Sequence, residues 1–160
     1  MKKLGFVLFP LLALGVGALS GYLSQPGLTA VYPYLEKSAL TPPGYMFPVV
    51  WTVLYLLMGL SLALVVQRGG KGVGASTLFW VLQLALNFSW SLLFFGTGAY
   101  FEALICLSLL WLVLLLMMLA FHSVRPLAAW LQVPYFLWVS FAGYLNLMVW
   151  QLNPDRKSVV

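Results

Sequence analysis

The sequence is short of charged residues, which make up 7% of its 160 residues, and it has three acidic side chains and one histidine. A chain with so few charges cannot cover itself with polar surface, so a soluble globular domain is excluded. The scarcity of carboxylates and imidazoles leaves no plausible paired carboxylates, nucleophile triad or metal-ligand cluster, so acid–base catalysis and a metal site are not expected. The single cysteine, Cys106, excludes an internal disulfide framework.

Long hydrophobic runs take the place of charge. Hydrophobic residues make up 63% of the chain, and a helix needs about 20 apolar residues to cross a hydrocarbon layer of about 30 Å. We therefore predict an all-α integral membrane protein, a five-transmembrane-helix bundle that forms one domain over residues 1–153. The predicted helices cover about residues 4–24, 47–67, 77–96, 100–122 and 128–152, with a lid loop over 25–46 and a C-terminal tail over 154–160.

The first run also resembles a secretory signal peptide, because Lys2 and Lys3 precede an apolar stretch. That stretch, residues 4–23, is longer than the usual hydrophobic region of such a peptide, which favours a first membrane helix. Gly17 and Gly21 form a small-xxx-small step that would let another helix approach closely, within the molecule or from a second copy.

Basic residues gather at loops and termini, which indicates membrane orientation and not nucleic-acid binding. With five spans, the basic residues on the side of the N-terminus are Lys2, Lys3, Arg68, Lys71 and Arg125, and those on the other side are Lys37, Arg156 and Lys157. Five against three favours a cytoplasmic N-terminus.

The second helix carries a column of aromatic residues. Pro42 and Pro43 end the preceding loop, since proline lacks an amide donor and its ring clashes with the preceding helical turn. Phe47, Trp51 and Tyr55 follow at i, i+4 and i+8, so they stack on one helical face. Two of them, Trp51 and Tyr55, carry a polar N–H or O–H group into an apolar environment.

Two further helices show polar or aromatic stripes. The third carries a stripe of Gln83, Asn87, Trp90 and Ser91, and because amides facing lipid are costly, this stripe should face other helices or a cavity. On the fifth helix, one face is shared by Tyr135, Trp138, Ala142 and Asn146. We expect Pro134 to kink that helix and open space beside Tyr135.

These stripes predict a binding pocket for a flat hydrophobic molecule, with apolar walls and indole N–H and amide groups that fix its orientation. The alternative is that the aromatic residues form membrane-interface belts, which we favour for Trp111, Trp130 and Trp150, or serve packing alone. Glu102 could relay protons and His122 could bind haem iron, but both lie near helix ends, where an interfacial role is favoured.

Three ordered motifs resemble a known family. The first is Thr41-Pro42-Pro43, Phe47-Pro48, Trp51-Thr52, Leu54-Tyr55 and Met58; the second is Gln83, Asn87 and Trp90; the third is Val-Pro-Tyr-Phe-Leu-Trp over 133–138 with Phe141-Ala142 and Leu145-Asn146. Together they resemble the tryptophan-rich sensory protein family, also called the translocator protein or peripheral benzodiazepine receptor family. The resemblance covers nearly the whole chain.

The resemblance implies a five-helix bundle, commonly a homodimer, with a pocket beneath the first loop. It implies binding of porphyrins such as protoporphyrin IX, and of benzodiazepine and isoquinoline-carboxamide ligands, as ligand or substrate with no required cofactor. By position the family's pocket corresponds to Tyr32, Pro42, Trp51, Tyr55, Asn87, Trp90, Ser91, Tyr135, Trp138 and Ala142, to which the helical face adds Phe47. Bacterial members are linked to light- and oxygen-dependent porphyrin degradation, which would give Trp51 and Trp138 a catalytic role.

The sequence also departs from the family pattern. In the lid, Ser38 and Leu40 stand where the family usually has proline and tryptophan, and Cys106 stands where many members have an acid. Leu147 and Gln151 occupy the tyrosine and basic positions of the family's cholesterol pattern, so cholesterol binding is not supported.

The leading hypothesis is therefore a membrane receptor for tetrapyrroles, surrounded by membrane lipid, that also promotes their photo-oxidative breakdown. A transporter of porphyrins or other lipophiles is the alternative, although neither inverted repeats nor paired broken helices are evident. A structural or regulatory partner protein without a ligand is the third hypothesis. The ligand-binding hypotheses require the indoles of the second and fifth spans to point together into one enclosed space.

Overall fold

The computed structural model describes residues 2–154, and all the regular structure in that range is helical. The five long helices are α1 (Gly5–Ala30), α2 (Met46–Arg68), α3 (Val73–Ser91), α4 (Tyr100–Val124) and α6 (Val133–Leu152). The short ones are the 3₁₀ helices η1 (Lys2–Leu4) and η2 (Tyr32–Tyr34), the π-helical turn η3 (Leu92–Gly96) and α5 (Pro126–Trp130). The predicted tail over 154–160 falls outside the described residues except for its first position.

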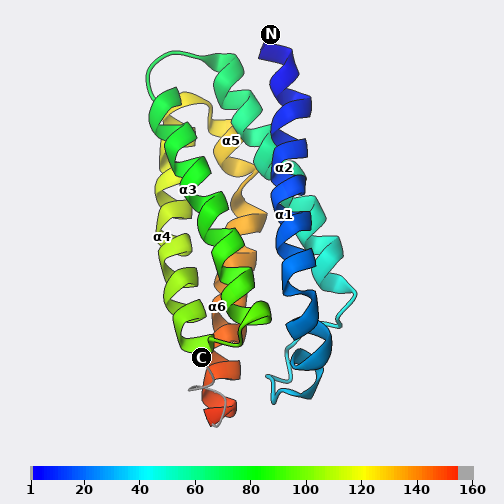
Figure 1. The fold of residues 1–160 in the computed structure, drawn as a ribbon. Helices are drawn as coiled ribbons and strands as arrows, with labels where there is room; N and C mark the ends of the chain where they lie inside the picture. The colour runs from blue at the N-terminus through cyan, green and yellow to red at the C-terminus, as the bar shows by residue number, and fades with distance from the viewer. Residues whose placement is uncertain (1, 155–160) are drawn as a thin grey trace.

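The helices run roughly along one axis and form a bundle (Figure 1). α1 packs along α2, α3 along α4, and α4 along α6. The α2–α3 loop and the N-terminus lie at one end, and the segment between α1 and α2, the lid, lies at the other end together with the end of α6 (Figure 1). In the described part of the chain, five segments are long and apolar enough to cross a membrane: Gly5–Ala30, Met46–Arg68, Val73–Gly96, Tyr100–Val124 and Pro126–Leu152.

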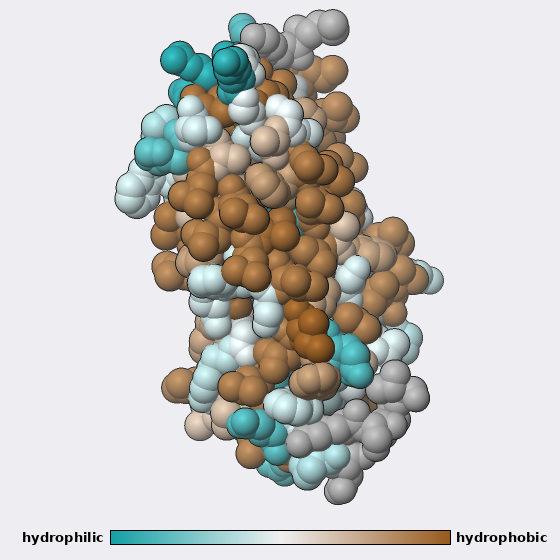
Figure 2. Space-filling model, turned by 90° about the vertical axis from the view of Figure 1, so that its left-hand side faces the viewer, coloured by the Kyte–Doolittle hydropathy of each residue, from teal (hydrophilic) through white to brown (hydrophobic). Residues whose placement is uncertain are grey.

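The surface of the bundle is apolar along its length. Figure 2 shows one face covered by hydrophobic side chains, with hydrophilic residues gathered toward its ends. Large exposed hydrophobic residues include Leu8, Leu11, Leu19, Val53, Leu82, Leu109 and Leu116. Water would penalise such a surface and lipid would not, because hydrocarbon tails are as apolar as leucine. The predicted all-α, five-helix fold class is confirmed.

Several helix boundaries differ from those expected from the sequence. α3 begins at Val73, four residues before the expected start. α1 continues through Pro26 to Ala30, so the first six residues of the expected lid loop are helical. Proline removes one amide donor and its ring crowds the preceding turn, and close packing at the next residue offsets this: a side chain at Gly27 would collide with the carbonyl oxygen of Phe95. The lid proper is therefore residues 31–45.

The fifth span is broken, not merely kinked. A turn at Leu131 and Gln132 separates α5 from α6, and Pro134 lies in the first turn of α6, where its missing N–H costs nothing. The Gln132 Nε2 donates to the Leu57 carbonyl oxygen (3.2 Å) and to the Ser61 Oγ (2.6 Å), both on α2. These bonds join the turn before α6 to α2.

Candidate functional site

Trp51 lies where α2, α3 and α6 meet. Its ring centroid is 6.3 Å from that of Trp90 on α3, and 6.2 and 6.4 Å from those of Tyr135 and Trp138 on α6. Tyr55, one turn farther along α2, is 5.7 Å away. The indoles of the second and fifth spans therefore meet each other, and their planes are almost perpendicular (89°).

The lid covers this aromatic cluster. Tyr32 packs edge-on against Phe47 (6.3 Å) and against Phe95 in η3 (5.1 Å). Burial raises the pKa of Tyr32 to about 12, with a further contribution from Tyr100. The Lys37 ammonium lies 4.7 Å from the Tyr32 ring centroid and donates to the carbonyl oxygen of the same residue (2.9 Å).

Side chains at the end of α6 hold the lid in place. The Asn153 side chain accepts from the Glu36 N–H (3.1 Å) and donates to the Glu36 carbonyl oxygen (2.8 Å), so it pairs with the lid backbone much as a strand would. The hydroxyls of Ser38 and Tyr144 are 2.8 Å apart. Desolvation lowers the pKa of Lys37, against an opposing contribution from Glu36.

The polar residues of the three aromatic helices are bonded to one another. Tyr55 donates to the Asn87 Oδ1 (2.9 Å), and the Asn87 Nδ2 donates to the Tyr135 hydroxyl (2.9 Å), which donates to the Gln83 Oε1 (2.7 Å). Because both ends of its amide are engaged within the protein, Asn87 fixes the relative positions of α2, α3 and α6. The Trp90 indole donates in turn to the Asn146 Oδ1 (3.0 Å).

A large cavity of about 570 Å³ lies between α1, α2 and α3. This size is within the range of pockets that hold drug-sized ligands. α1 contributes Leu14, Gly17, Ala18, Ser20, Gly21, Ser24, Gln25 and Leu28; α2 contributes Phe47, Pro48, Trp51, Thr52 and Tyr55; α3 and η3 contribute Asn87, Trp90, Ser91 and Phe95. Its wall is thus largely apolar and aromatic, and it reaches the surface where Ala18, Gly21 and Thr52 are exposed.

A second, much smaller space of about 20 Å³ lies directly beneath the lid, on the other side of Trp51. It has room for about one water molecule. It is bordered by Tyr32, Phe47, Trp51, Trp90, Phe94, Phe95, Trp138, Ala142, Leu145 and Asn146. Phe47, Trp51, Trp90 and Phe95 border both spaces, so these four rings form a partition between them.

The residues predicted for the site divide between these spaces. Of the eleven, Tyr55, Asn87 and Ser91 border the large cavity, Tyr32, Trp138 and Ala142 border the small one, and Phe47, Trp51 and Trp90 border both. Tyr135 and Pro42 border neither of the two. The Tyr135 side chain does not face the expected space, because it is fully buried and its hydroxyl is hydrogen-bonded to Asn87 and Gln83. A hollow of about 400 Å³ is bordered instead by its neighbours Pro134, Leu137 and Trp138 together with residues of α2.

The contribution of α1 to the cavity was not predicted. Gly17, Ser20, Gly21 and Ser24 recur at i, i+3, i+4 and i+7, a small and polar stripe on an otherwise leucine-rich helix that could have indicated it. Ser24 joins α1 to α3, because its Oγ lies 3.1 Å from the Ser91 Oγ. Gly17 packs within the molecule, since a Cβ there would collide with the Tyr55 ring.

The other residues considered from the sequence lie apart from these spaces. Glu102 is exposed in the first turn of α4 and His122 is exposed in its last turn. Within residues 2–154 no group of three His, Cys, Asp or Glu side chains is placed to hold a metal ion. Trp130 is 67% exposed, whereas the Trp111 indole donates to the Ser140 Oγ (2.9 Å) and Trp150 packs on Phe101 (5.0 Å).

Comparison with known proteins agrees with the resemblance seen in the sequence motifs. The model of the TspO/MBR family matches residues 6–151. The chain is 41% identical to the Tryptophan-rich protein TspO of Chlorobaculum tepidum over 145 residues, which cover 89% of this chain and 92% of that one. It is 38% identical to Protein CrtK of Rhodobacter capsulatus (88% of both chains) and 35% identical to the Translocator protein of Bos taurus (99% of this chain and 94% of that one).

Proposed function

The chain belongs to the TspO/MBR family and is an integral, multi-pass membrane protein, and on this basis we propose that it is a membrane receptor for porphyrins and other flat hydrophobic ligands of the benzodiazepine and isoquinoline type. Relatives named tryptophan-rich sensory protein and translocator protein support a receptor or translocator role. Protoporphyrin IX is the ligand that we propose to test first.

One observation carries the proposal: a cavity of about 570 Å³ has the Trp51 ring in its wall and the Trp138 ring directly behind it. A flat aromatic ligand stacked on an indole gains the favourable geometry of aromatic pairs in addition to the burial of its surface. The partition rings Phe47 and Trp51 have the small space on their far side, so a wider ligand can extend toward Trp138 if these rings rotate. Trp51 is thus the primary contact in our proposal, and Trp138 the second.

The same geometry supports photo-oxidative breakdown of the bound porphyrin. A light-excited porphyrin transfers its energy to dioxygen, and the singlet oxygen formed adds across a methine bridge of the porphyrin ring. The O–O bond and the bridging C–C bond then break to leave two carbonyl groups on an opened tetrapyrrole, so both oxygen atoms stay in the product and no other oxidant is needed. Trp51 holds the ring by stacking, and Trp138, with its ring centroid 6.4 Å from that of Trp51, supports it from behind. Light and dioxygen drive this chemistry on the ligand, and the protein orients it.

Binding and bleaching of protoporphyrin IX by the purified protein test the proposal. We expect tryptophan quenching with a saturable dependence on porphyrin, and a Trp51→Phe, Trp138→Phe double variant to bind about tenfold more weakly and bleach the porphyrin more slowly under light. The matched control is the double variant Trp111→Phe, Trp130→Phe, since these two side chains border neither the large cavity nor the small space beneath the lid. Equal binding and bleaching by both double variants would refute the assigned roles.

Transport is the second candidate, favoured by the name of the bovine relative. Net uptake of porphyrin into sealed proteoliposomes, against a protein-free control, would support it.

A further inference from the structure

Most polar side chains that border the large cavity already have hydrogen-bond partners. Tyr55 and Asn87 are bonded to each other, Ser24 and Ser91 form a pair across α1 and α3, and the Trp90 indole donates to Asn146. Thr52 donates to the carbonyl oxygen of Pro48 in its own helix (2.7 Å). A ligand can engage any of these groups only in competition with a contact that holds the helices in place.

Ser20 is different. It borders the cavity from α1 and is 98% buried, and its hydroxyl has no hydrogen-bond partner among residues 2–154. A buried hydroxyl without a partner has lost its bonds to water and gained none in return, which is unfavourable. Serine has only one side-chain torsion before its hydroxyl, with three staggered positions, so this group can turn to meet a ligand.

The surroundings of Ser20 leave room for a ligand on this wall. Gly21, the next residue, has open space at its Cβ position: apart from its chain neighbours and the backbone of its own helical turns, no described atom lies within 4 Å. None of the residues found to border the cavity in the described structure carries a charge. A charged group on the ligand would therefore lose its hydration with no counter-charge, whereas a neutral oxygen would satisfy the Ser20 hydroxyl at little cost.

We propose that Ser20 is the hydrogen-bonding anchor of the cavity between α1, α2 and α3, and that it selects flat apolar ligands that present a neutral carbonyl oxygen to α1. The inference rests on the proposed receptor function and adds a chemical rule to it. Stacking on Trp51 selects flatness and size, and Ser20 selects the neutral acceptor. Ser20 is thus a specificity-determining residue, and charged groups of a larger ligand stay outside this part of the cavity.

A pair of probes of one shape isolates the effect of the carbonyl group. Benzanthrone is a flat four-ring ketone, and 7H-benzanthrene has a methylene group in place of the carbonyl. Their dissociation constants for the purified protein in detergent are measured by tryptophan quenching. We expect the wild-type protein to favour the ketone by about two- to tenfold over the hydrocarbon, the range of one net hydrogen bond.

Three variants attribute this preference to one hydroxyl. Ser20→Ala should bind both probes equally, and Ser20→Thr, which keeps a hydroxyl, should retain the preference. Ser76→Ala is the matched control, because Ser76 is also a fully buried serine whose Oγ finds no partner within the described residues, and it does not border the cavity. Ser76→Ala should leave the preference unchanged.

The outcomes separate the anchor from the receptor function. A ketone preference that persists in Ser20→Ala, or that is absent from the wild-type protein, overturns the anchor while leaving porphyrin binding intact. Loss of the preference in Ser76→Ala as well would also overturn it, since the effect would then be general to the fold. If neither probe binds while protoporphyrin IX does, the cavity is not the site for neutral ketones; if protoporphyrin IX also fails to bind, the receptor proposal itself fails.

Discussion

At the residue scale, the site depends on how closely α1 approaches the aromatic column of α2. Gly17 allows this approach, because any side chain there would occupy the position of the Tyr55 ring. Tyr55 in turn donates to Asn87, which donates to Tyr135. One missing Cβ therefore supports a chain of hydrogen bonds that spans three helices.

Replacement of that glycine tests this dependence. Gly17→Ala should lower the free energy of unfolding by about 1–3 kcal/mol, since the new methyl group displaces the Tyr55 ring and weakens its bond to Asn87. Thermal unfolding in detergent measures the change. Gly21→Ala, one turn later on α1 with open space at its Cβ position, should be nearly neutral. Equal melting temperatures for the two variants would show that α1 is not packed on α2 as described.

Individual residues also mark the limit of what the sequence predicts. It identified Asn87 as a polar residue that must face the interior, which the structure bears out. It could not show that the Asn87 side chain would be hydrogen-bonded to the hydroxyls of Tyr55 and Tyr135. Those partners come from α2 and α6, and their approach depends on the packing of the whole bundle.

At the element scale, the lid is joined to the end of α6 by few contacts. Asn153 forms two hydrogen bonds with the backbone of Glu36, and Ser38 contacts Tyr144. The aromatic side of the lid rests on η3 and on the first turn of α2. A segment attached in this way can open without unfolding of the bundle, because its backbone bonds are few and local.

Removal of the Asn153 side chain should favour lid opening. In Asn153→Ala we expect faster hydrogen exchange at the Glu36 amide and faster association of porphyrin, while the bundle keeps its melting temperature within a few degrees. Hydrogen-exchange mass spectrometry of residues 31–45 measures the first effect. Gln151→Ala is the control, since that side chain is exposed in the same part of α6. Unchanged exchange in Asn153→Ala would mean that the hydrogen bonds of Asn153 do not hold the lid.

Hydropathy and proline positions predicted the five spans, and the ends of α2 and α4 to within two residues, but not the end of α1 or the break in the fifth span. Contacts between helices determine these two features. Close packing of Gly27 on Phe95 lets α1 continue past Pro26, and the hydrogen bonds from Gln132 to α2 stabilise the break before α6. Both are long-range contacts, so no local pattern in α1 or α6 could indicate them.

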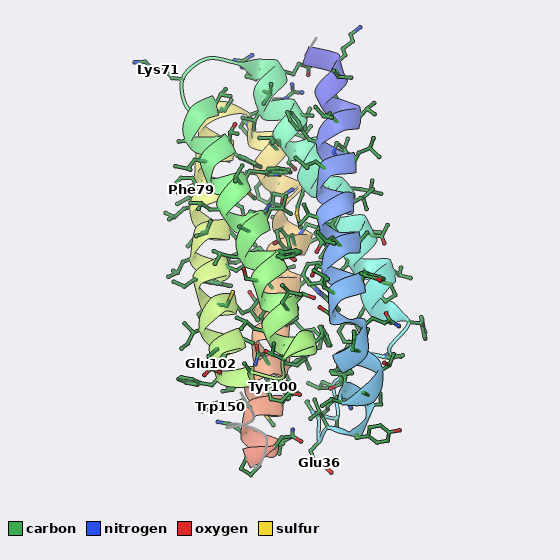
Figure 3. All side chains as sticks on the ribbon, viewed as in Figure 1. Glu36, Lys71, Phe79, Tyr100, Glu102 and Trp150 are labelled. Carbon is green, nitrogen blue, oxygen red and sulfur yellow. The ribbon has the colours of Figure 1, made fainter. Side chains whose placement is uncertain are left out.

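At the scale of the whole molecule, charge is distributed unequally between the two ends of the bundle. The N-terminal end carries Lys3, Arg68, Lys71 and Arg125, whereas the lid end of the described chain carries Lys37 with two acids, Glu36 and Glu102. Lys71 lies at the opposite end from Glu36 and Glu102 (Figure 3). Because basic loops stay in the cytoplasm, we propose that the N-terminus is cytoplasmic and that the lid faces the other side.

Cysteine labelling in spheroplasts tests this orientation. In a Cys106→Ala background, a membrane-impermeant maleimide should label Ala39→Cys in the exposed lid from outside, and should label Lys71→Cys only after the membrane is permeabilised. The parent without cysteine controls for background. The reverse pattern would place the lid in the cytoplasm.

The architecture also shows why the position of the cavity was harder to predict than the fold. Composition and family motifs predicted a pocket between α2, α3 and α6, and these helices do meet at Trp51. Yet their aromatic side chains and amides fill the space between them, and the larger opening lies toward α1. A cavity is the volume that side chains leave empty, so it depends on the sum of many contacts and not on any one motif.

The central claim, that a flat ligand occupies the cavity between α1, α2 and α3, is tested most directly by filling that cavity. Gly21 and Gly15 are exposed α1 glycines. Apart from their chain neighbours and the backbone of their own helical turns, no described atom lies within 4 Å of either Cβ position, but of the two only Gly21 borders the cavity. We predict that Gly21→Phe weakens protoporphyrin IX binding at least tenfold, whereas Gly15→Phe binds as the wild-type protein does. Undiminished binding by a folded Gly21→Phe variant would contradict the account.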